Sequence, residues 1–538
     1  MNLNLLQDKW GSNVITGDAL AVKPPYAIFK NTVKAIQLLH KHIQRNSKIA
    51  IHCDVDLDGI GSGYILKRVL DYHNCTNQVL LINKDKVHGI QQKHVDFFKT
   101  YKIDLLIILD SSSNEIDYIK QFNCDVLVVD HHNVSQDEHD GKTLDNKHEF
   151  IIVNNTLENY KFNVEIEWLR NKNNSAFENI DSYDVTSDMA CGLTIYELLR
   201  IYCVCYSNEK LLENLMLYQW VAVTLFTDSV NLLNDRNQWY ICNTVSSMQV
   251  ERSLNIMLHE INKYKQQLSK SYINYELAPL INKAIRAGAG SEAIDICLNR
   301  PQDINQLYKY AELQKQVLQT AIRSDEVYLE NFICKDVTSI NIGQNYNIEN
   351  YCGVIATRLC GDFNKNAVAY KIKDGKAKGS FRGRYSDVDY RKFFEEYAPG
   401  IFAQGHKPAF GFEVDAELLP KIMSRIHEIE PTEDEQYYIT AGRMDDELKG
   451  INHITDMDSF KKQGLLWRLA IGNSRVASRD ELVIIVPLKD VVLSEIKGKV
   501  YEYDVLGIKC KSFSPLSSNL VQIYLEYTNN IDCYIKNI

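Results

Sequence analysis

The segment HCDVDLDGIGS places four side chains that can bind a metal at alternate positions, His52, Asp54, Asp56 and Asp58. Alternate residues of an extended chain point the same way, so this spacing can aim several ligands at one cavity, and the two glycines that follow permit a turn. Carboxylate oxygens with an imidazole suit Mn²⁺ or Mg²⁺, and suit Zn²⁺ less well without cysteine. Taken alone, the segment is also compatible with a solvated loop or a calcium site.

Two later apolar runs also end in ionisable residues. DLLIIL is followed by Asp110, and DVLVV is followed by Asp130, His131 and His132. A single Asp after a strand is commonly the N-cap of the next helix. Three consecutive ionisable groups after a buried run are costly unless something satisfies them, and a metal bound by one imidazole does so. Asp228, after WVAVTLFT, is a weaker candidate because an Asp at a helix end is common.

The elements that must position these residues follow from the hydrophobic pattern. Short apolar runs alternate with helical patterns over the first 155 residues, as is typical of parallel strands joined by crossover helices. The predicted strands are residues 48–53, 78–82, 104–109, 125–129 and 150–153. Ligands of an open α/β sheet bind beyond the carboxyl ends of its strands. We therefore expect the acidic and His-containing turns to gather at one edge of the sheet.

The length of 538 residues predicts several domains, because one hydrophobic core does not serve a chain of this size. We expect an α/β chain in which residues 1–245 form a catalytic domain with a parallel sheet and residues 246–335 form a helical connector. Residues 336–430 are expected to form a smaller α/β substrate-binding domain. Residues 431–538 read as a β-rich domain, for which an OB-like barrel is one option.

Composition excludes some classes of protein. A hydrophobic content of 45% and a charged content of 24% are close to globular averages, and the net charge of -10 argues against a surface that attracts nucleic acid everywhere. The thirteen cysteines form no CxxC pair, which favours reduced thiols in a cytoplasmic protein. Neither a signal peptide nor a run of 18 apolar residues is present, so we expect neither secretion nor contact with a membrane.

Eight segments, in order, resemble one known superfamily. DVDLDG, the Asp of IILDSS, VVDHHN and AVTLFTDSVNL resemble the four motifs of the DHH phosphoesterases. INKAIRAG and GVIATRL are similar to segments of RecJ-like exonucleases, and GSFRG and QGHKPAFGF resemble the DHH-associated domain. The chain departs from the RecJ-like pattern at His52, where an apolar residue is usual, and at Gly383, Gln404 and Phe410. These departures bear on substrate preference more than on catalysis.

The resemblance implies a hydrolase that uses two divalent cations, Mn²⁺ or Mg²⁺. One cation would be bound by Asp56, Asp110 and His52, and the other by Asp58, Asp110, His131 and Asp228. Asp110 would then bridge the two ions, while Asp54 would be a ligand or lie just outside the ligands. A water shared by the cations would attack the phosphorus in an in-line displacement.

The resemblance also assigns substrate contacts. The catalytic His132 would face the phosphate, with Asp130 supporting the histidine pair. Arg286, Ser380, Arg382 and His406 would hold the substrate, because a guanidinium offers a bidentate fork for phosphate. The basic segment KIKDGKAKGSFRGR is usually a solvated hairpin face, but beside such a site it is expected to line the path of a polyanion.

The leading interpretation is a RecJ-like nuclease of DNA repair or recombination that degrades single-stranded DNA, with 5′ to 3′ polarity by family resemblance. Its partner would be single-stranded nucleic acid. One alternative is a phosphodiesterase for short oligonucleotides or cyclic dinucleotides, in the manner of nanoRNases, and product length separates the two. A second alternative is a non-catalytic replication or repair scaffold, which predicts no hydrolysis of any phosphodiester with Mn²⁺ present.

Overall fold

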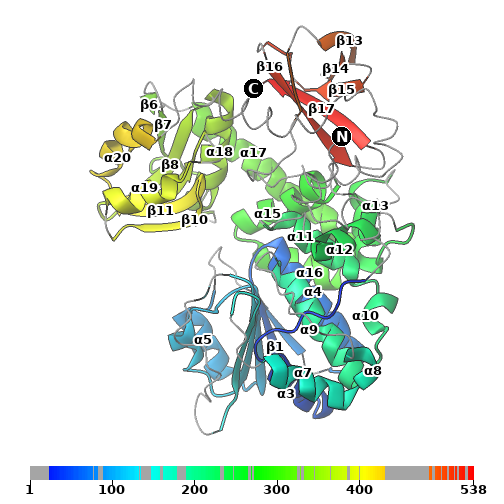
Figure 1. Cartoon of the computed structure of the whole chain (residues 1–538). Helices are drawn as coiled ribbons and strands as arrows, with labels where there is room; N and C mark the ends of the chain where they lie inside the picture. Colours follow the sequence, from blue (N-terminus) through cyan, green and yellow to red (C-terminus); the bar gives the residue numbers. More distant parts are fainter. Residues whose placement is uncertain are drawn as a thin grey trace.

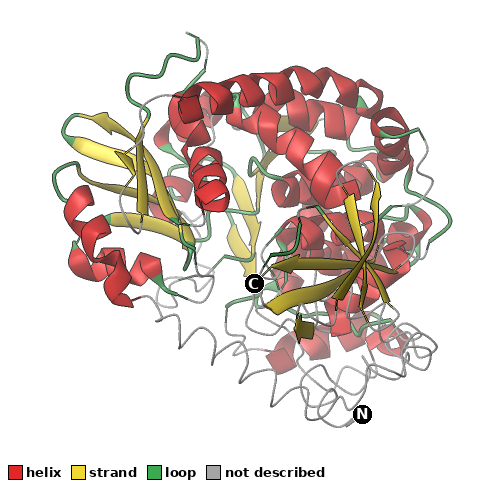
Figure 2. Ribbon diagram, turned by 90° about the horizontal axis from the view of Figure 1, so that it is seen from above, coloured by secondary structure: helices red, strands yellow, loops and turns green. Residues whose placement is uncertain are grey.

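The computed structural model describes residues 23–429 and the strands between residues 484 and 537, with interruptions. Residues 1–22, 83–88, 135–146, 158–161, 178–188, 231–234, 264–267 and 430–483 lie outside the described residues, as do gaps of one to three residues. Three sheets and a set of helices make up the described chain (Figure 1). Seen from above, the second and third sheets lie apart from each other (Figure 2). Within the described residues, no helix combines the length and the apolar character needed to cross a bilayer.

The first sheet contains the five predicted strands, which confirms the expected parallel α/β architecture. They are β1 (Ile49–Cys53), β2 (Gln78–Ile82), β3 (Leu105–Leu109), β4 (Asp125–Asp130) and β5 (Phe150–Asn154). Their order is β2-β1-β3-β4-β5, and every neighbouring pair is parallel. Every residue of β1, β3, β4 and β5 is buried. A parallel sheet is covered on both faces, which explains why these strands read as continuous apolar runs.

Helices cover both faces of this sheet. One core contains Ile51 and Leu109 and packs against α3 (Thr32–Gln44), α4 (Leu57–Tyr72), α9 (Cys191–Tyr206) and α11 (Tyr218–Thr227). The other contains Ile108 and Val128 and packs against α5 (Gln92–Thr100) and α6 (Ile116–Ile119). Shorter helices complete this part of the chain, namely α7 (Phe162–Lys172), α8 (Asn174–Phe177) and α10 (Leu211–Asn214). The two helical layers thereby hold the carboxyl ends of the strands in a fixed register.

The connector is helical and shares the larger core of the first sheet, since Leu254, Ile281 and Ile294 belong to that same cluster. The buried carboxylate of Glu251 joins the two regions, because it accepts hydrogen bonds from Tyr64 Oη at 2.7 Å and Trp220 Nε1 at 3.2 Å. Helix α12 (Asp235–Val245) leads into the connector, whose elements are α13 (Arg252–Ile261), the π-helix η3 (Ile273–Leu277), α15 (Ala278–Arg286), α16 (Gly290–Asn299), the 3-10 helix η4 (Pro301–Leu307) and α17 (Tyr308–Arg323).

The second sheet has the order β10-β11-β9-β8-β7-β6. Its strands are β6 (Val327–Tyr328), β7 (Phe332–Asp336), β8 (Asn366–Lys373), β9 (Lys376–Arg382), β10 (Phe402–His406) and β11 (Ala409–Asp415). It therefore begins before the predicted domain start at residue 336. The predicted hairpin is β8 and β9, and its turn is Asp374 and Gly375 with φ of 51° and 75°, as an Asp-Gly type I′ turn requires.

Helices also pack on both faces of the second sheet. Val368 and Phe381 share a core with α19 (Tyr390–Tyr397) and α20 (Leu419–Arg425). Ala367 and Ala369 share another with α17 and α18 (Cys352–Phe363). Two short 3-10 helices flank this region, η5 (Ile348–Tyr351) and η6 (Ile426–Ile429). Since α17 belongs to both the connector and this core, it links the second sheet to the first.

The third sheet has the order β12-β16-β17-β15-β14-β13, in which only β15 and β17 pair in parallel. The strands are β12 (Ile484–Pro487), β13 (Val491–Lys497), β14 (Val500–Val505), β15 (Ile508–Ser512), β16 (Leu520–Tyr527) and β17 (Ile531–Asn537). Its two outermost strands, β12 and β13, are separated by residues 488–490 alone. That link spans at most about 15 Å, whereas five strand spacings of a flat sheet measure roughly 24 Å. The sheet must therefore curl toward closure.

Candidate metal centre

The carboxyl ends of β1, β3 and β4 bring together the acidic and His-containing turns, as the parallel topology requires. The first turn runs directly into α4, and Asp56 is the N-cap of that helix. Its Oδ1 accepts hydrogen bonds from the backbone N–H groups of Asp58 at 2.9 Å and Gly59 at 3.0 Å. A Cβ at Gly59 would lie 2.5 Å from the carbonyl oxygen of Asp54, so only glycine allows this tight turn. The DxDxDG spacing is therefore dictated by the strand-to-helix junction.

The carboxylate of Asp58 is held by the N-terminus of α9. Its Oδ2 accepts from the N–H of Cys191 at 2.7 Å, and its Oδ1 accepts from the N–H of Gly192 at 2.8 Å. These donors at the positive end of a helix dipole stabilise the carboxylate. A Cβ at Gly192 would lie 2.4 Å from Thr224 Oγ1 on α11, so the glycine lets the two helices approach. Sequence reasoning missed these amides, although the glycine in MACGLT at a helix start was a usable signal.

Asp110 follows β3 in the left-handed region, with φ of 66°. Its backbone N–H continues the sheet by donating to the carbonyl oxygen of Val129 at 2.9 Å. Asp is among the few residues that tolerate this conformation, which turns the side chain out of the strand direction. The carboxylate is almost fully buried, with 2% of the side chain exposed.

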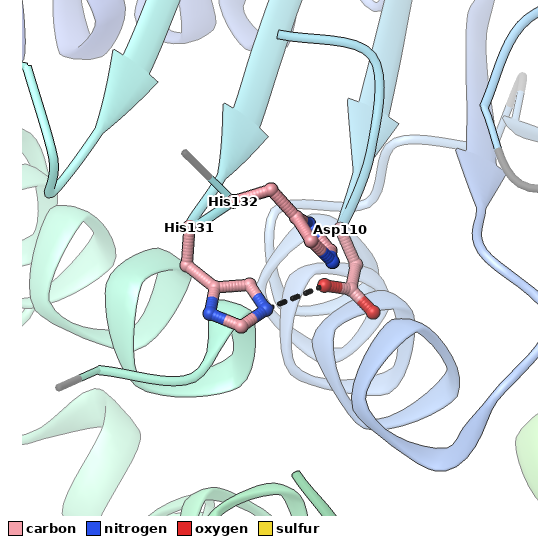
Figure 3. Close-up of side chains that lie close together, drawn as sticks. All are labelled: Asp110, His131 and His132. Carbon is pink, nitrogen blue, oxygen red and sulfur yellow. Dashed lines mark ion pairs between the residues drawn. The ribbon is translucent and has the colours of Figure 1, made fainter. Parts of the chain in front are cut away.

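His131 lies at the centre of the carboxylates. Its Nε2 is 3.2 Å from Asp110 Oδ1 and 3.7 Å from Asp58 Oδ2, while its Nδ1 is 3.5 Å from Asp228 Oδ2. Figure 3 shows the His131 ring pointing from the end of β4 toward the Asp110 carboxylate. Asp228 is the C-cap residue of α11, so a helix that packs against α4 and α9 contributes to a site that is otherwise built where strands end and α4 begins.

His132 has a different environment from its neighbour. Its Nδ1 lies 2.8 Å from Oδ1 of the buried Asp130, which also accepts from the N–H groups of His131 and His132. Burial lowers the pKa of His132, but the hydrogen bond and the charge of Asp130 outweigh it and raise the pKa to about 9. The same contacts hold the pKa of Asp130 well below its ordinary value, against the effect of burial. The hydrogen bond to Asp130 therefore fixes the orientation of the His132 ring.

Three sets of ligand atoms lie within 4.8 Å of one another and could each hold a cation. They are Asp54, Asp56 and Asp110; Asp58, His131 and Asp228; and Asp110, His131 and His132. Asp110 belongs to two of these sets, and so does His131. Asp110 thus stands between the carboxylates of the first turn and the histidine of β4.

The chemistry of this cluster fits divalent cations. Burial and the charges of Asp228 and Asp56 raise the pKa of Asp58 well above its ordinary value. Burial and the charges of Asp58 and Asp56 do the same to the pKa of Asp110. No Lys or Arg of the described chain forms an ion pair with Asp56, Asp58 or Asp110. Buried like charges need compensation, and oxygen ligands with one imidazole suit Mn²⁺ or Mg²⁺.

His52 is placed apart from the three ligand sets. It is 1% exposed, and neither ring nitrogen has a hydrogen-bond partner among the described residues. Its ring meets that of His94 on α5 edge-on, with 5.1 Å between the centroids. Burial, and then the charge of His94, lower the pKa of His52 to about 3, so the imidazole is neutral. The role of His52 as a metal ligand stays a prediction, since His52 belongs to none of the three ligand sets.

The predicted substrate residues of the second sheet and the connector meet at a different place. Arg382 on β9 donates from Nε to Thr357 Oγ1 at 3.0 Å and from Nη1 to the carbonyl oxygen of Phe381 at 2.7 Å. A Cβ at Gly353 would lie 3.1 Å from Arg382 Nη2 and 3.4 Å from Ser380 Oγ, so the glycine leaves room beside both groups. The GVIATRL and GSFRG segments therefore adjoin in space.

Arg286 lies close enough to repel Arg382. Burial, followed by the charge of Arg286, lowers the pKa of Arg382. Arg286 donates from Nη1 to Gln314 Oε1 at 3.0 Å, and its carbonyl oxygen accepts from Asn350 Nδ2 at 3.1 Å. Neither arginine forms an ion pair with an acidic residue of the described chain. The backbone of His406 pairs with Ala409 at the end of β10, and its side chain lies outside the described residues.

Three of the four lysines of the β8–β9 hairpin form ion pairs with neighbouring acids. Lys371 pairs with Glu349 at 3.3 Å. Across the sheet, Lys376 pairs with Asp415 at 2.9 Å and Lys378 with Glu413 at 3.8 Å. The basic run of the sequence is therefore largely balanced, in contrast to the two arginines.

Comparison with known proteins bears on both the fold and the chemistry. Residues 48–151 match the DHH family, N-terminal domain. The putative SPbeta prophage-derived single-strand DNA-specific exonuclease YorK of Bacillus subtilis (strain 168) is 22% identical over 502 residues, covering 81% of this chain and 75% of that protein. These matches confirm the expected resemblance to the DHH phosphoesterases.

Solved structures resemble the fold. RecJ from Thermus thermophilus in complex with Mn²⁺ aligns with a TM-score of 0.59 at 15% identity, covering 95% of this chain and 72% of that one. The same protein in complex with Mg²⁺ aligns with a TM-score of 0.54 at 14% identity, covering 96% and 71%. At this level of identity the likeness establishes the fold, which confirms the RecJ-like architecture expected from the motifs.

Proposed function

We propose that this chain, a DHH-type phosphoesterase with a RecJ-like fold, is an exonuclease that degrades single-stranded DNA from the 5′ end with two divalent cations. The observation that carries the proposal is the convergence on His131 of Asp58 from α4, Asp110 after β3 and Asp228 at the end of α11, with no described Lys or Arg to neutralise Asp58 or Asp110. The name of the Bacillus subtilis relative, a putative single-strand DNA-specific exonuclease, supports the choice of substrate.

The residues that would hold the cations divide into two sets around Asp110. Asp54 and Asp56 adjoin it on one side, and Asp58, His131 and Asp228 gather on the other. When bound, Mn²⁺ or Mg²⁺ would supply an activated water and stabilise the negative charge that develops on the phosphoryl oxygens. The chain itself would hold the ligands in place before the substrate binds. Such preorganisation is usually the largest electrostatic contribution to catalysis.

His132 and the two arginines would handle the phosphates. The His132 ring would contact a non-bridging oxygen of the scissile phosphate through Nε2, because its Nδ1 is taken by Asp130. Arg286 and Arg382 repel one another at the junction of the connector and the second sheet, and a phosphate between them would relieve that repulsion. In Figure 1 the first and second sheets lie on the same side of the connector helices, so one strand of DNA could pass both.

The domain assignment follows the same scheme. We assign residues 1–245 to catalysis, the connector to spacing, and the second sheet to substrate phosphates. In the curled third sheet the meander β13-β14-β15 is joined to β17 by a parallel pair, which suits an OB-like barrel, a fold that binds oligonucleotides. We assign it to the part of the strand that lies farther from the cleaved bond.

End-labelled DNA and RNA of several lengths, single- and double-stranded, test the proposal with Mn²⁺, Mg²⁺ or a chelator. We expect release of nucleotides from the 5′ end of single-stranded DNA, no cleavage with chelator, and no cleavage by D110A. Equal or better turnover of two-residue substrates would instead favour the oligonucleotide phosphodiesterase. If no phosphodiester is hydrolysed with Mn²⁺ present, the scaffold interpretation replaces the enzyme.

A further inference from the structure

Asn154, the last residue of β5, makes four hydrogen bonds with a side chain that is fully buried. Its Nδ2 donates to Ser113 Oγ at 3.0 Å and to the carbonyl oxygen of His132 at 2.9 Å. Its Oδ1 accepts from the N–H and the Oγ1 of Thr156, both at 2.8 Å. Both hydrogens and both lone pairs of the amide are used, so a flipped amide would set acceptor against acceptor.

The two partners of Nδ2 belong to the two turns that carry the candidate site. Ser113 comes three residues after Asp110, and its N–H donates to Asp130 Oδ2 at 3.2 Å. Asp130 Oδ1 in turn lies 2.8 Å from His132 Nδ1. The hydrogen bonds therefore form a closed ring through Asn154, Ser113, Asp130 and His132. A ring of this kind fixes the imidazole from its backbone and from its side chain together.

The ring contains none of the candidate carboxylate ligands, and His131 reaches it only through its backbone N–H, which donates to Asp130 Oδ1 at 2.8 Å. None of Asp56, Asp58 and Asp110 is hydrogen-bonded to Asn154, and Asp58 is held instead by the N-terminus of α9. The outer end of the ring is the part that meets solvent, since 44% of the His132 side chain is exposed against 1% for Asp130. Loss of the Asn154 donors should thus displace His132 and leave the cation ligands in place.

We propose that Asn154 is a positioning residue of the phosphoesterase, which aims the His132 imidazole at the substrate phosphate by donating its two amide hydrogens to the turns after β3 and β4. The inference rests on the proposed function, because the phosphate contact of His132 belongs to it. The inference predicts that a change at Asn154 alters turnover but not cation affinity, whereas a general loss of structure would alter both. Turnover depends on Asn154, and affinity for the cations does not.

The variant N154D tests the donors with almost no change in shape. A carboxylate cannot donate to Ser113 Oγ or to the His132 carbonyl, and it places a negative oxygen against that carbonyl. A matched control is N31D, because Asn31 Nδ2 donates at 3.0 Å to the carbonyl oxygen of Ile152 on the same strand, away from the site. We expect kcat to fall by about 10- to 100-fold in N154D, as for other small misplacements of a catalytic group, and by less than about threefold in N31D.

Three further measurements separate positioning from general damage. The Mn²⁺ concentration at half-maximal activity should change by less than about threefold in N154D. In an enzyme that already carries H132A, adding N154D should lower kcat little further, because residues that act together give non-additive losses of kcat. The ¹⁵N resonances of the His132 ring, assigned by their absence in H132A, should shift in N154D and stay in place in N31D.

The outcomes are distinct. Equal losses in N154D and N31D, or the same loss in the presence and absence of His132, would overturn the inference. If N154D does not fold, T156V removes only the hydroxyl that donates to Asn154 Oδ1 and lies 3.3 Å from the His132 carbonyl oxygen, and it should lower kcat by about three- to fivefold. If the wild-type protein hydrolyses no phosphodiester, the proposed function fails by itself. The inference then depends on the His132 resonances, and unchanged resonances in N154D would overturn it.

Discussion

Charged side chains cluster in two regions of this molecule, and only in one of them do the charges lack described partners of opposite sign. At the edge of the parallel sheet, Asp56, Asp58 and Asp110 come from distant segments and meet no described Lys or Arg. On the β8–β9 hairpin, lysines follow one another closely in sequence, and three of them are paired with acidic residues of adjacent elements, namely Glu349, Glu413 and Asp415. Convergence of like charges without compensation indicates a binding site, whereas a contiguous run that is balanced by adjacent elements indicates a solvated surface.

The largest effect should come from the residue at the centre of the unbalanced region. D110A removes the carboxylate shared by two ligand sets, so hydrolysis should fall by at least about 1,000-fold, equivalent to about 4 kcal/mol in the activation free energy. The fold should survive, because the substitution also removes a buried like charge whose pKa is raised by burial, Asp58 and Asp56. Hydrolysis of single-stranded DNA and circular dichroism are the measurements. Full activity in a folded D110A protein would show that the convergence is not the site.

A smaller loss of activity should follow from changes to Arg382, which forms no ion pair with a described acidic residue, just as Asp58 and Asp110 form none with a described Lys or Arg. R382A is expected to lower kcat/KM by about 10- to 100-fold, the range for one charge-assisted contact to a phosphate. R382K keeps the charge and loses the planar fork, so it should recover only part of the activity. Neither variant should unfold the protein, since burial and Arg286 already disfavour the charged guanidinium. An R382A enzyme with wild-type kcat/KM would place Arg382 outside the substrate path.

Much of the unbalanced region could be predicted from the sequence, because strand periodicity and motif order depend on local residues. The five parallel strands follow directly from the apolar runs, and the turns of the candidate site follow from the three runs that lead into Asp or His. Asn154 and the amides of Cys191 and Gly192 were not predicted, since their roles arise from contacts between separate elements. The two residues NN directly after the apolar run FIIV were the available signal for Asn154.

Two other predictions depended on tertiary contacts that the sequence does not encode locally. His52 alternates with Asp54 along an extended chain, but it belongs to β1, and its side chain faces α5 and His94. The lysines of the hairpin read as a basic path, but cross-strand register places Glu413 opposite Lys378 and Asp415 opposite Lys376. The ligand role of His52 and the substrate role of the lysines stay predictions, because the sequence alone does not show which residues surround them in space.

Removal of metal should reveal the repulsion in the acidic cluster as a dependence of stability on pH. Asp58 and Asp110 have a raised pKa in the folded protein, so the unfolded chain releases their protons first as the pH rises. The metal-free protein should therefore lose stability from the ordinary pKa of an Asp up to the raised values. Saturating Mn²⁺ should restore several degrees of Tm, as expected for a ligand that binds only the folded state. Thermal unfolding with EDTA or Mn²⁺ between pH 4 and pH 8 measures this.

The control for that experiment is D110N, which removes one of the like charges and keeps the shape. Its metal-free Tm should vary less with pH than that of the wild type, and Mn²⁺ should raise it less. A wild-type Tm that is insensitive to Mn²⁺ would contradict a metal centre built from these carboxylates.

The smallest effect is expected from the balanced region. In K376A/K378A the lost lysines were already paired with Asp415 and Glu413, so kcat/KM on single-stranded DNA should change by less than about threefold. The complementary variant, E413Q/D415N, removes the acidic partners of both lysines and should tighten binding of DNA. Its affinity should also depend more steeply on salt, because the unpaired lysines would displace counterions from the DNA. Fluorescence anisotropy of labelled DNA at several salt concentrations measures both. A loss of tenfold or more in K376A/K378A would mean that these lysines exchange their acidic partners for phosphates, and the contrast between the two regions would then be one of degree.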